Sequence, residues 1–310
     1  MRKKVFITDY VGLSTKLETL ALAFVISDRY GHDVCLDWPE LKSFNVAGAR
    51  KEGLGLTGRI GALRLRNYSD ELFSRIKDHN KVILRTHNGP AHLLERVYIP
   101  TAKRVKLRPD LVAAIRTTFS RYANRPVVGV HIRRGDFQLV DDGTFDVNRH
   151  EWPATPTWWY EHVMGKIAAA HKDVAFYVSC TGDLDAFDSL KKNFDVFEVP
   201  TTSLYSYKGP DHDSKCDPAA DLFALGCCSV LVASACSTFS HYAANALGGP
   251  TTCLIPPPTM TKDNPGFGKL NMYGKGAALW CQFCREGLNT VAVNTPADIP
   301  EPTPASCDWL

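Results

Sequence analysis

Two adjacent arginines, Arg133 and Arg134, end an apolar run within residues 127–136, VVGVHIRRGD. The run predicts a buried parallel strand, and ligands of open α/β sheets bind outside the carboxyl ends of such strands. Side chains alternate along a strand, so the two arginines should leave on opposite sides. A guanidinium can bind phosphate oxygens through two parallel hydrogen bonds. The segment therefore predicts an anion site, and the alternative is a structural pair in which Arg134 binds Asp136 and closes a turn at Gly135.

Three neighbours of the arginines have roles that follow from their chemistry. Gly135 would let the backbone come close to a diphosphate, and Asp136 is a candidate acid/base or a partner for an arginine. His131 is expected to be a packed strand residue more than a base.

A second candidate anion site is the run Ser237-Thr238-Phe239-Ser240, which begins a predicted helix. Hydroxyls and free backbone N–H groups at a helix start bind phosphate well. The alternative is simple capping of the helix by Ser237. The chain has no G-x-x-x-x-G-K-[ST] phosphate loop.

A metal ion is the usual alternative to arginine for neutralising a diphosphate. The two D-x-D triplets, Asp183-Leu184-Asp185 and Asp211-His212-Asp213, do not clearly follow a suitable strand, and such triplets arise often by chance. Arginine supplies comparable electrostatic stabilisation. We therefore predict no bound metal and no cofactor beyond the substrates.

Composition excludes several classes of protein. With 310 residues, 45% hydrophobic residues and a net charge of +3, the chain is that of a soluble globular protein with two domains, not of a nucleic-acid binder. No signal peptide or transmembrane segment stands out, which favours a cytoplasmic enzyme or one whose membrane anchor is missing from this sequence.

The ten cysteines do not reach the density of a disulfide scaffold. Five of them fall in or beside predicted buried elements and are expected to be small core residues. Cys281 and Cys284 have C-x-x-C spacing, with Cys307 further on. Free thiols are the expected state, with a disulfide and a zinc site as the alternatives.

Strands alternate with helices along most of the chain, which predicts an α/β fold with a doubly wound parallel sheet. The predicted domains are residues 1–125 and 126–310, with a Pro- and Gly-rich tail after Pro256 that packs back across the first domain. Within them we expect strands at 4–7, 33–37, 81–85, 127–132, 174–179, 196–199, 229–234 and 251–255, and helices at 13–30, from 109, 156–171, 184–192, 217–228 and 238–247. Residues 39–66 are expected to form loops and short pieces.

Four segments in order resemble a fucosyltransferase superfamily with the HxRRGD motif, which includes α1,2-fucosyltransferases, nodulation α1,6-fucosyltransferases and protein O-fucosyltransferases. They are the arginine motif itself, the opening GLSTKLETLA at residues 12–21, the strand and S-C-T-G-D run at 176–183, and the S-T-F-S run that ends a helix–strand segment from Asp217. Trp38 follows an apolar segment as in the family. Ser14 and Thr15 stand where the family has Gly and Asn.

The resemblance implies a GT-B fold, in which two Rossmann-like domains face a cleft, and it assigns roles to single residues. Arg133 would contact the β-phosphate of GDP, and the edge that carries Thr181 and Asp183 would contact the nucleoside. The base is not uniform across the superfamily, so Asp9, Asp37 and Glu95 remain candidates beside Asp136. The full set of expected donor-binding residues is Gly12, His131, Arg134, Gly135, Thr181, Asp183, Asp221, Ser237, Thr238, Phe239 and Ser240.

Two of these assignments have structural alternatives, because Asp183 could cap the following helix and Asp221 could be structural. The acceptor is expected to be a glycan hydroxyl. The long loop 137–155 is a candidate acceptor-binding element. Trp158, Trp159 and Tyr160 follow it and suit sugar stacking, although two of the three should pack into the core.

The function predicted from these features is an inverting, metal-independent transfer of fucose from GDP-fucose to a glycan. A glycosyltransferase that uses another activated sugar is the near alternative. A non-catalytic nucleotide- or glycan-binding protein is the alternative from another class.

Overall fold

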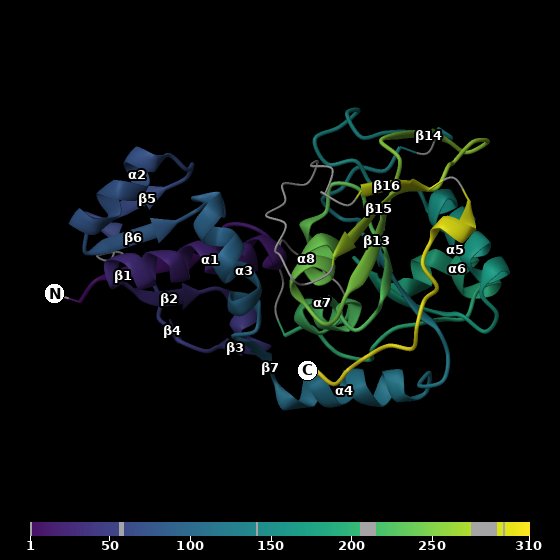
Figure 1. Ribbon diagram of the computed structural model, residues 1–310, viewed down its shortest axis with the longest axis horizontal. Helices are drawn as coiled ribbons and strands as arrows, with labels where there is room; N and C mark the ends of the chain where they lie inside the picture. Colours follow the sequence, from purple (N-terminus) through teal and green to yellow (C-terminus); the bar gives the residue numbers. More distant parts are fainter. Residues whose placement is uncertain (1, 56–58, 141, 205–214, 274–289, 294) are drawn as a thin grey trace. The chain divides into compact units, whose positions relative to one another are not determined.

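The computed structural model describes residues 2–55, 59–140, 142–204, 215–273, 290–293 and 295–310 and divides the chain into two compact units. The N-terminal unit runs to Arg108 and the C-terminal unit begins at Pro109. Each unit is built on its own mainly parallel sheet with helices packed against it (Figure 1). No helix in the described ranges is long and apolar enough to cross a membrane.

The N-terminal unit has a five-stranded parallel sheet in the order β4-β2-β1-β6-β5. A separate two-stranded antiparallel sheet consists of β3 and β7. The strands are β1 (Lys4–Thr8), β2 (Asp33–Asp37), β3 (Phe44–Val46), β4 (Ala49–Lys51), β5 (Leu63–Leu65), β6 (Lys81–Leu84) and β7 (Val105–Leu107). The helices are α1 (Leu13–Tyr30), α2 (Asp70–Arg75) and α3 (Ala91–Ala102), with 3₁₀ turns at Pro39–Lys42 and Ile76–Asp78.

Helix α1 is buried along most of its length because residues 17–26 are apolar or small on nearly every side. It packs on α3 and on β1. The helix ends at Gly31, which adopts a left-handed φ of 71° and donates its N–H to the Ser27 carbonyl. Glycine takes this conformation without steric cost. The chain can therefore turn directly from α1 into β2.

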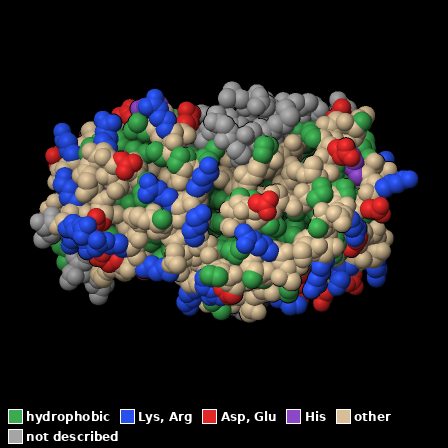
Figure 2. All heavy atoms as spheres, turned by 60° about the horizontal axis from the view of Figure 1, so that its bottom comes forward, with side chains coloured by type: hydrophobic (Ala, Val, Ile, Leu, Met, Phe, Trp, Pro, Cys, Tyr) green, Lys and Arg blue, Asp and Glu red, His purple; other side chains and the backbone are tan. Residues whose placement is uncertain are grey.

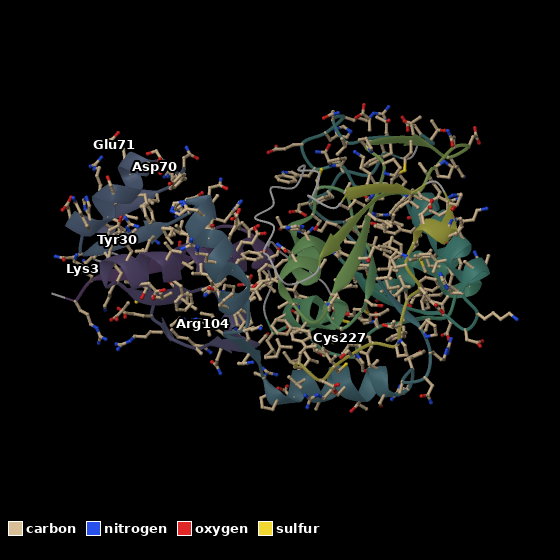
Figure 3. All side chains as sticks on the ribbon, viewed as in Figure 1. Lys3, Tyr30, Asp70, Glu71, Arg104 and Cys227 are labelled. Atoms are coloured by element: carbon tan, nitrogen blue, oxygen red, sulfur yellow. The ribbon has the colours of Figure 1, made fainter. Side chains whose placement is uncertain are left out.

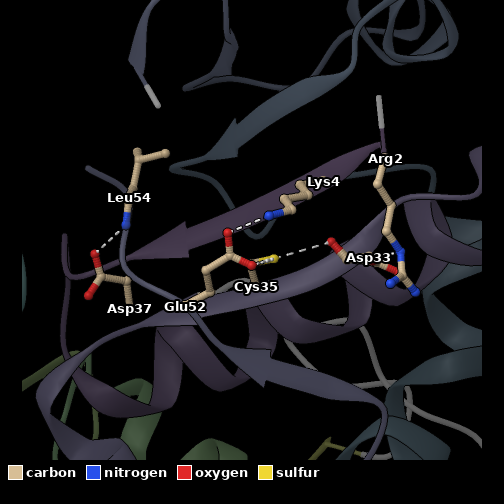
Figure 4. Close-up of polar contacts among 7 residues, drawn as sticks. All are labelled: Arg2, Lys4, Asp33, Cys35, Asp37, Glu52 and Leu54. Atoms are coloured by element: carbon tan, nitrogen blue, oxygen red, sulfur yellow. Dashed lines mark hydrogen bonds and ion pairs between the residues drawn. The ribbon is translucent and has the colours of Figure 1, made fainter. Parts of the chain in front are cut away.

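The connection from β4 to β5 crosses the sheet, because these two strands form its opposite edges. Leu54 packs there against the cluster Phe6, Cys35 and Ile83. Glu52 accepts hydrogen bonds from Lys4 (2.5 Å) and from the Cys35 thiol (3.5 Å), as Figure 4 shows. These contacts fix the crossing segment to the sheet.

The described part of the C-terminal unit has a seven-stranded sheet in the order β11-β10-β8-β12-β13-β15-β16. Its pairs are parallel except for β13 with β15 and β15 with β16. A separate pair, β9 and β14, lies in the loops. The strands are β8 (Val127–Ile132), β9 (Thr144–Asp146), β10 (Ala175–Cys180), β11 (Val196–Phe197), β12 (Val230–Val232), β13 (Thr251–Ile255), β14 (Thr259–Thr261), β15 (Gly268–Tyr273) and β16 (Thr290–Val293). The helices are α4 (Pro109–Ser120), α5 (Thr157–Ala170), α6 (Asp188–Asn193), α7 (Pro218–Leu225) and α8 (Thr238–Ala246), with 3₁₀ turns at Leu184–Phe187 and Pro296–Asp298.

Helices cover both faces of this second sheet, so it is doubly wound. Side chains of α5 and α6 join the large core cluster on one face, and α7 packs with α4 and α8 on the other (Figure 1). Strand β8 is central and all six of its residues are buried. A Cβ on Gly129 of β8 would lie 2.5 Å from Leu231, so glycine lets the neighbouring side chains close over the strand.

The units divide after Arg108, seventeen residues before the boundary predicted after Arg125, because α4 packs into the C-terminal unit. Phe119 of α4 contacts the rings of Tyr177 and Phe197, with centroids 5.4 and 5.5 Å away. The described tail residues 295–310 also pack on the C-terminal unit, where Ile299 joins its core. Other parts of the predicted tail form β14, β15 and β16 of the same unit, and not a segment of the first domain. Residues 274–289, which include Cys281 and Cys284, lie outside the described part of the chain.

On the face that Figure 2 shows, Lys and Arg side chains are interspersed with Asp and Glu side chains. They do not merge into one continuous basic field there. This mixture accords with the small net charge of +3.

Candidate functional site

The predicted anion site lies where the strand order of the C-terminal sheet reverses. From β8 the chain proceeds to β10 and β11 on one side, whereas β12 and β13 extend the sheet on the other. Arg133 follows β8 and Ser234 follows β12, two neighbouring parallel strands. Connections diverge at such a switch point, and ligands of α/β proteins bind in the crevice that results.

Arg133, Asp136 and Thr181 come together at this edge. The Arg133 guanidinium forms an ion pair of 2.7 Å with Asp136, and both side chains are 24% exposed. Arg133 also donates to the Thr181 hydroxyl at 3.5 Å and lies over the Phe137 ring, 5.5 Å from its centroid. These contacts hold the guanidinium in one direction while leaving part of its surface open to a ligand.

The turn after β8 depends on Gly135, whose φ of 76° is in the left-handed region. This conformation returns the chain so that Asp136 reaches Arg133, three residues back. The pair closed by the turn is therefore Arg133–Asp136, and not the Arg134–Asp136 pair considered from sequence alone.

Arg134 points to the start of α5. Its guanidinium donates to the Thr155 carbonyl (2.9 Å) and to the Thr157 hydroxyl (3.1 Å). It also lies 5.5 Å from the centre of the Phe187 ring. These contacts fasten the end of β8 to α5 and give Arg134 a structural task beside its predicted role in donor binding.

Two buried hydroxyls, of Ser234 and Tyr160, hold the backbone of the arginine motif, and the sequence predicted neither contact. Ser234 accepts a hydrogen bond of 2.7 Å from the Arg133 N–H. The Tyr160 hydroxyl lies 2.7 Å from the Ser234 hydroxyl, and both lie 3.0 Å from the His131 carbonyl. Because the three partners come from distant parts of the chain, only the position of Ser234 just after an apolar strand could have indicated it.

His131 is a packed residue, as expected. Its ring stacks on Phe239 with centroids 4.9 Å apart, and Nδ1 lies 3.4 Å from the Ser240 hydroxyl. Burial, followed by the charge of Arg133, lowers the pKa of His131 to about 3. The imidazole is therefore neutral near pH 7, and it joins β8 to the first turn of α8.

The start of α8 is the second element at this edge. Ser237 caps the helix, and its hydroxyl accepts from the Phe239 N–H at 3.4 Å. Ser237 and Thr238 are half-exposed, whereas Ser240 is buried. Cys236, just before the cap, has a φ of 54°. Strain of this kind in a non-glycine residue often marks functional turns.

Asp183 and Asp185 are engaged in local structure. Asp183 caps the 3₁₀ turn through the Asp185 N–H (3.0 Å) and pairs with Lys215 (3.1 Å), while Asp185 pairs with Lys191 (2.5 Å). The other D-x-D triplet, Asp211 to Asp213, lies outside the described residues. Among residues that are described, no three His, Cys, Asp or Glu side chains meet in a way that could hold a metal ion.

Asp221 is buried beneath β10 and has a structural position. It accepts hydrogen bonds from the Tyr177 hydroxyl (2.8 Å) and the Ser179 hydroxyl (3.3 Å). Burial raises its pKa to about 7. The residue thereby ties α7 to the strand that leads to Thr181.

Gly12 and the other candidate bases belong to the N-terminal unit. Gly12 is extended and directly precedes α1. Asp9 binds the ammonium of the buried Lys16 (2.6 Å), which also binds Glu40, and Asp37 accepts from the Leu54 N–H (3.0 Å; Figure 4). Glu95 is exposed on α3.

The aromatic run on α5 divides as predicted. Trp159 and Tyr160 are fully buried, and Trp158 is partly buried against the same core. The preceding loop 137–155 is not structureless, since β9 within it pairs with β14 and Gln138 bridges to Pro153. The described part of the loop is therefore held against the C-terminal unit.

Comparison with known proteins identifies the fold. No protein-family model and no curated protein matches this chain. Among solved structures, NodZ fucosyltransferase from Bradyrhizobium matches with a TM-score of 0.51 and 16% identity over 82% of this chain and 96% of that one. This chain shares its fold. NodZ α-1,6-fucosyltransferase co-crystallised with GDP gives 0.53 and 18% over 88% and 99%. A mutant of Arabidopsis thaliana FUT1 in complex with GDP gives 0.52 and 12% over 83% and 71%. The predicted GT-B type of α/β fold is thus confirmed.

Proposed function

We propose that this protein is an inverting glycosyltransferase that moves fucose from GDP-fucose to a glycan hydroxyl without a metal ion. The observation that carries the proposal is the guanidinium of Arg133, oriented by Asp136 and Thr181 at the switch point of the C-terminal sheet. The fold shared with fucosyltransferases that bind GDP supports a guanosine nucleotide as the donor.

Arg133 neutralises the diphosphate in this mechanism. As the glycosidic bond to GDP breaks, negative charge grows on the bridging oxygen, and a fixed cation there stabilises the transition state more than the ground state. The first turn of α8, with the hydroxyls of Ser237 and Thr238, binds further phosphate oxygens. Thr181 and Asp183 contact the nucleoside.

The acceptor hydroxyl attacks the anomeric carbon from the side opposite to GDP, which inverts the configuration. Its proton passes to a carboxylate, for which Asp136 is our first candidate and Asp9, Asp37 and Glu95 are the others. In the free protein Asp136 already receives a hydrogen bond from Arg133, so it also orients the arginine.

Nucleotide binding tests the donor assignment. We expect GDP to raise the melting temperature in the presence of a chelator. At a concentration one hundred times its dissociation constant, GDP should stabilise the folded state by about 2.7 kcal/mol. UDP and dTDP should raise it less. A strict dependence on magnesium or manganese would overturn the arginine-only mechanism, and preference for UDP or dTDP would favour the alternative of another activated sugar.

Turnover tests the enzymatic assignment. GDP release from GDP-fucose should increase when a panel of glycan acceptors is added, and nuclear magnetic resonance of the product should show the inverted anomer. GDP binding without any turnover of GDP-fucose across the panel would instead support a non-catalytic binding protein.

A further inference from the structure

The last described segment of the chain, residues 303–310, runs along the amino-terminal edge of the second sheet. Thr303 accepts a hydrogen bond of 3.1 Å from Val127 N–H, at the start of β8, and its own N–H donates to the Ser229 hydroxyl at 3.0 Å. Ser306 N–H then donates to the Cys227 carbonyl at 2.9 Å. This segment therefore lies across the end of α7, beside Cys227 (Figure 3).

The surface under this segment, at the end of α7, is complementary to it. The Trp309 ring stacks on Phe223 of α7 with centroids 5.5 Å apart. A Cβ on Gly226 would lie 3.1 Å from Trp309 and 2.7 Å from Leu247, so glycine makes the room that the indole fills. Arg116 of α4 donates to the Leu310 carbonyl at 2.8 Å. Cys307 is therefore held in place by the contacts of Ser306 before it and of Trp309 after it.

This docking brings two thiols together. Cys307 directly follows Ser306, whose N–H binds the Cys227 carbonyl, so the two cysteines are neighbours. The interaction between their thiols raises the pKa of Cys227 and lowers that of Cys307. Cys227 is buried at the end of α7, whereas Cys307 is half-exposed. Cys228 points the other way, because its sulfur would lie 3.3 Å from a Cβ on Gly129 within the sheet.

We propose that Cys227 and Cys307 are a redox-active pair, which a small disulfide such as glutathione disulfide converts into a disulfide bond between the end of α7 and residues 303–310. Cys307 is the group that attacks, since it is the accessible member. The neighbouring Cys227 thiol lowers the pKa of Cys307 against the opposing effect of burial, and the charge of Arg116 lowers it further. A lower pKa increases the fraction of thiolate that reacts. Cys227 is the resolving thiol.

The reaction balances as two exchange steps. The Cys307 thiolate attacks one sulfur of glutathione disulfide, and one glutathione leaves as a thiolate. Cys227 then loses its proton and attacks the Cys307 sulfur of the mixed disulfide, so that the second glutathione leaves. The two protein thiols are oxidised by two electrons, and glutathione disulfide is reduced to two glutathione molecules.

The bond would stabilise the fold without touching the proposed donor site. It lies at the amino-terminal edge of the sheet, whereas Arg133 follows the carboxyl end of β8. A cross-link between residues far apart in sequence restricts the unfolded chain. We expect a higher melting temperature and unchanged GDP affinity in the cross-linked form.

Peptide mass spectrometry of the folded protein after glutathione disulfide treatment tests this assignment. A Cys281→Ser/Cys284→Ser background removes the C-x-x-C pair as a competitor. We expect a Cys227–Cys307 linked peptide that a reductant separates. Cys227→Ser should stop the reaction at a glutathione adduct on Cys307, and Cys307→Ser should leave Cys227 unmodified. Cys35→Ala, in the other unit, is the control and should not change the linkage.

Three results would overturn the proposal. They are the absence of the linked peptide, the absence of an adduct on Cys307 in Cys227→Ser, or equal modification of Cys227 and Cys228 in folded Cys307→Ser. Circular dichroism shows whether each variant is folded. Because no readout depends on a sugar donor, failure here and failure of the proposed transferase activity are separate outcomes.

Discussion

Arg133 and Asp136 form an ion pair of 2.7 Å across the left-handed turn at Gly135. The adjacent Arg134 instead binds the Thr155 carbonyl and Thr157 at the start of α5. The two neighbouring arginines thus have different roles. Arg133 faces the open edge of the sheet, whereas Arg134 connects the end of β8 to the start of α5. Substitution can separate the two tasks.

Arg133→Lys should lower turnover of GDP-fucose on the order of 100-fold or more, because lysine keeps the charge but loses the planar fork that grips a diphosphate. Arg134→Lys should mainly lower the melting temperature, because it loses hydrogen bonds to two residues of another element. Steady-state kinetics and thermal melts on both variants measure this. If Arg133→Lys keeps turnover within about threefold of wild type, the role of Arg133 is wrong; if only folded Arg134→Lys is inactive, the roles are exchanged.

Asp136→Asn should bind GDP at least as tightly as the wild type while turning over GDP-fucose more slowly. The carboxylate competes with a diphosphate for the Arg133 guanidinium, so its removal relieves that competition, but the guanidinium loses its orientation. Calorimetry measures the affinity for GDP, and initial rates measure the turnover of GDP-fucose. GDP affinity reduced tenfold or more in this variant would contradict the competition.

Ser234→Ala should slow turnover and destabilise the C-terminal unit by about 1–3 kcal/mol, because the buried Arg133 N–H loses its acceptor. Ser179→Ala is a matched control, because that serine is also buried in the same unit, within β10, but binds Asp221 and not the arginine motif. We expect Ser179→Ala to affect stability with little change in turnover. Equal loss of turnover in both variants would show that the effect is general to the sheet.

Glu18→Gln should remove a pH dependence from the stability of the N-terminal unit. Glu18 is buried in α1, and burial raises its pKa to about 8, from an ordinary value of 4.5. The folded state therefore keeps a proton that the unfolded state releases, so stability falls as pH rises from about 4.5 to 8, with a slope of up to about 1.4 kcal/mol per pH unit. Hydrogen exchange of the α1 amides at pH 5, 6.5 and 8 measures this slope. An equal slope in wild type and variant would contradict the assignment.

The sequence predicted the elements whose apolar patterns are unambiguous. Strands β8, β10 and β13 and helix α1 lie within a residue of their expected positions. It did not predict α3, which contains Pro100 and has only four buried positions. Nor did it predict β3 and β7, which are three residues long and depend on each other across the unit.

In the candidate site, too, local features could be predicted from the sequence and long-range contacts could not. The cluster of Arg133 with Asp136 is local and followed from the motif, although the choice between Arg133 and Arg134 as the partner required the backbone conformation at Gly135. Ser234 and Tyr160 reach the motif from about 100 and 30 residues away in the chain. Such contacts leave no local signal, since a lone serine after a strand has many possible tasks.

The burial of all six residues of β8 also affects how the ligand preference of such a protein can change during evolution. None of the strand's residues reaches solvent, whereas Arg133, Thr181 and Ser237 all stand on the connections that follow strands. Substitutions in those connections leave the packed interior unchanged, so ligand preference can change in small steps without passing through misfolded intermediates. Descendants of such a chain would be expected to differ most in these connections and least in the strand beneath them.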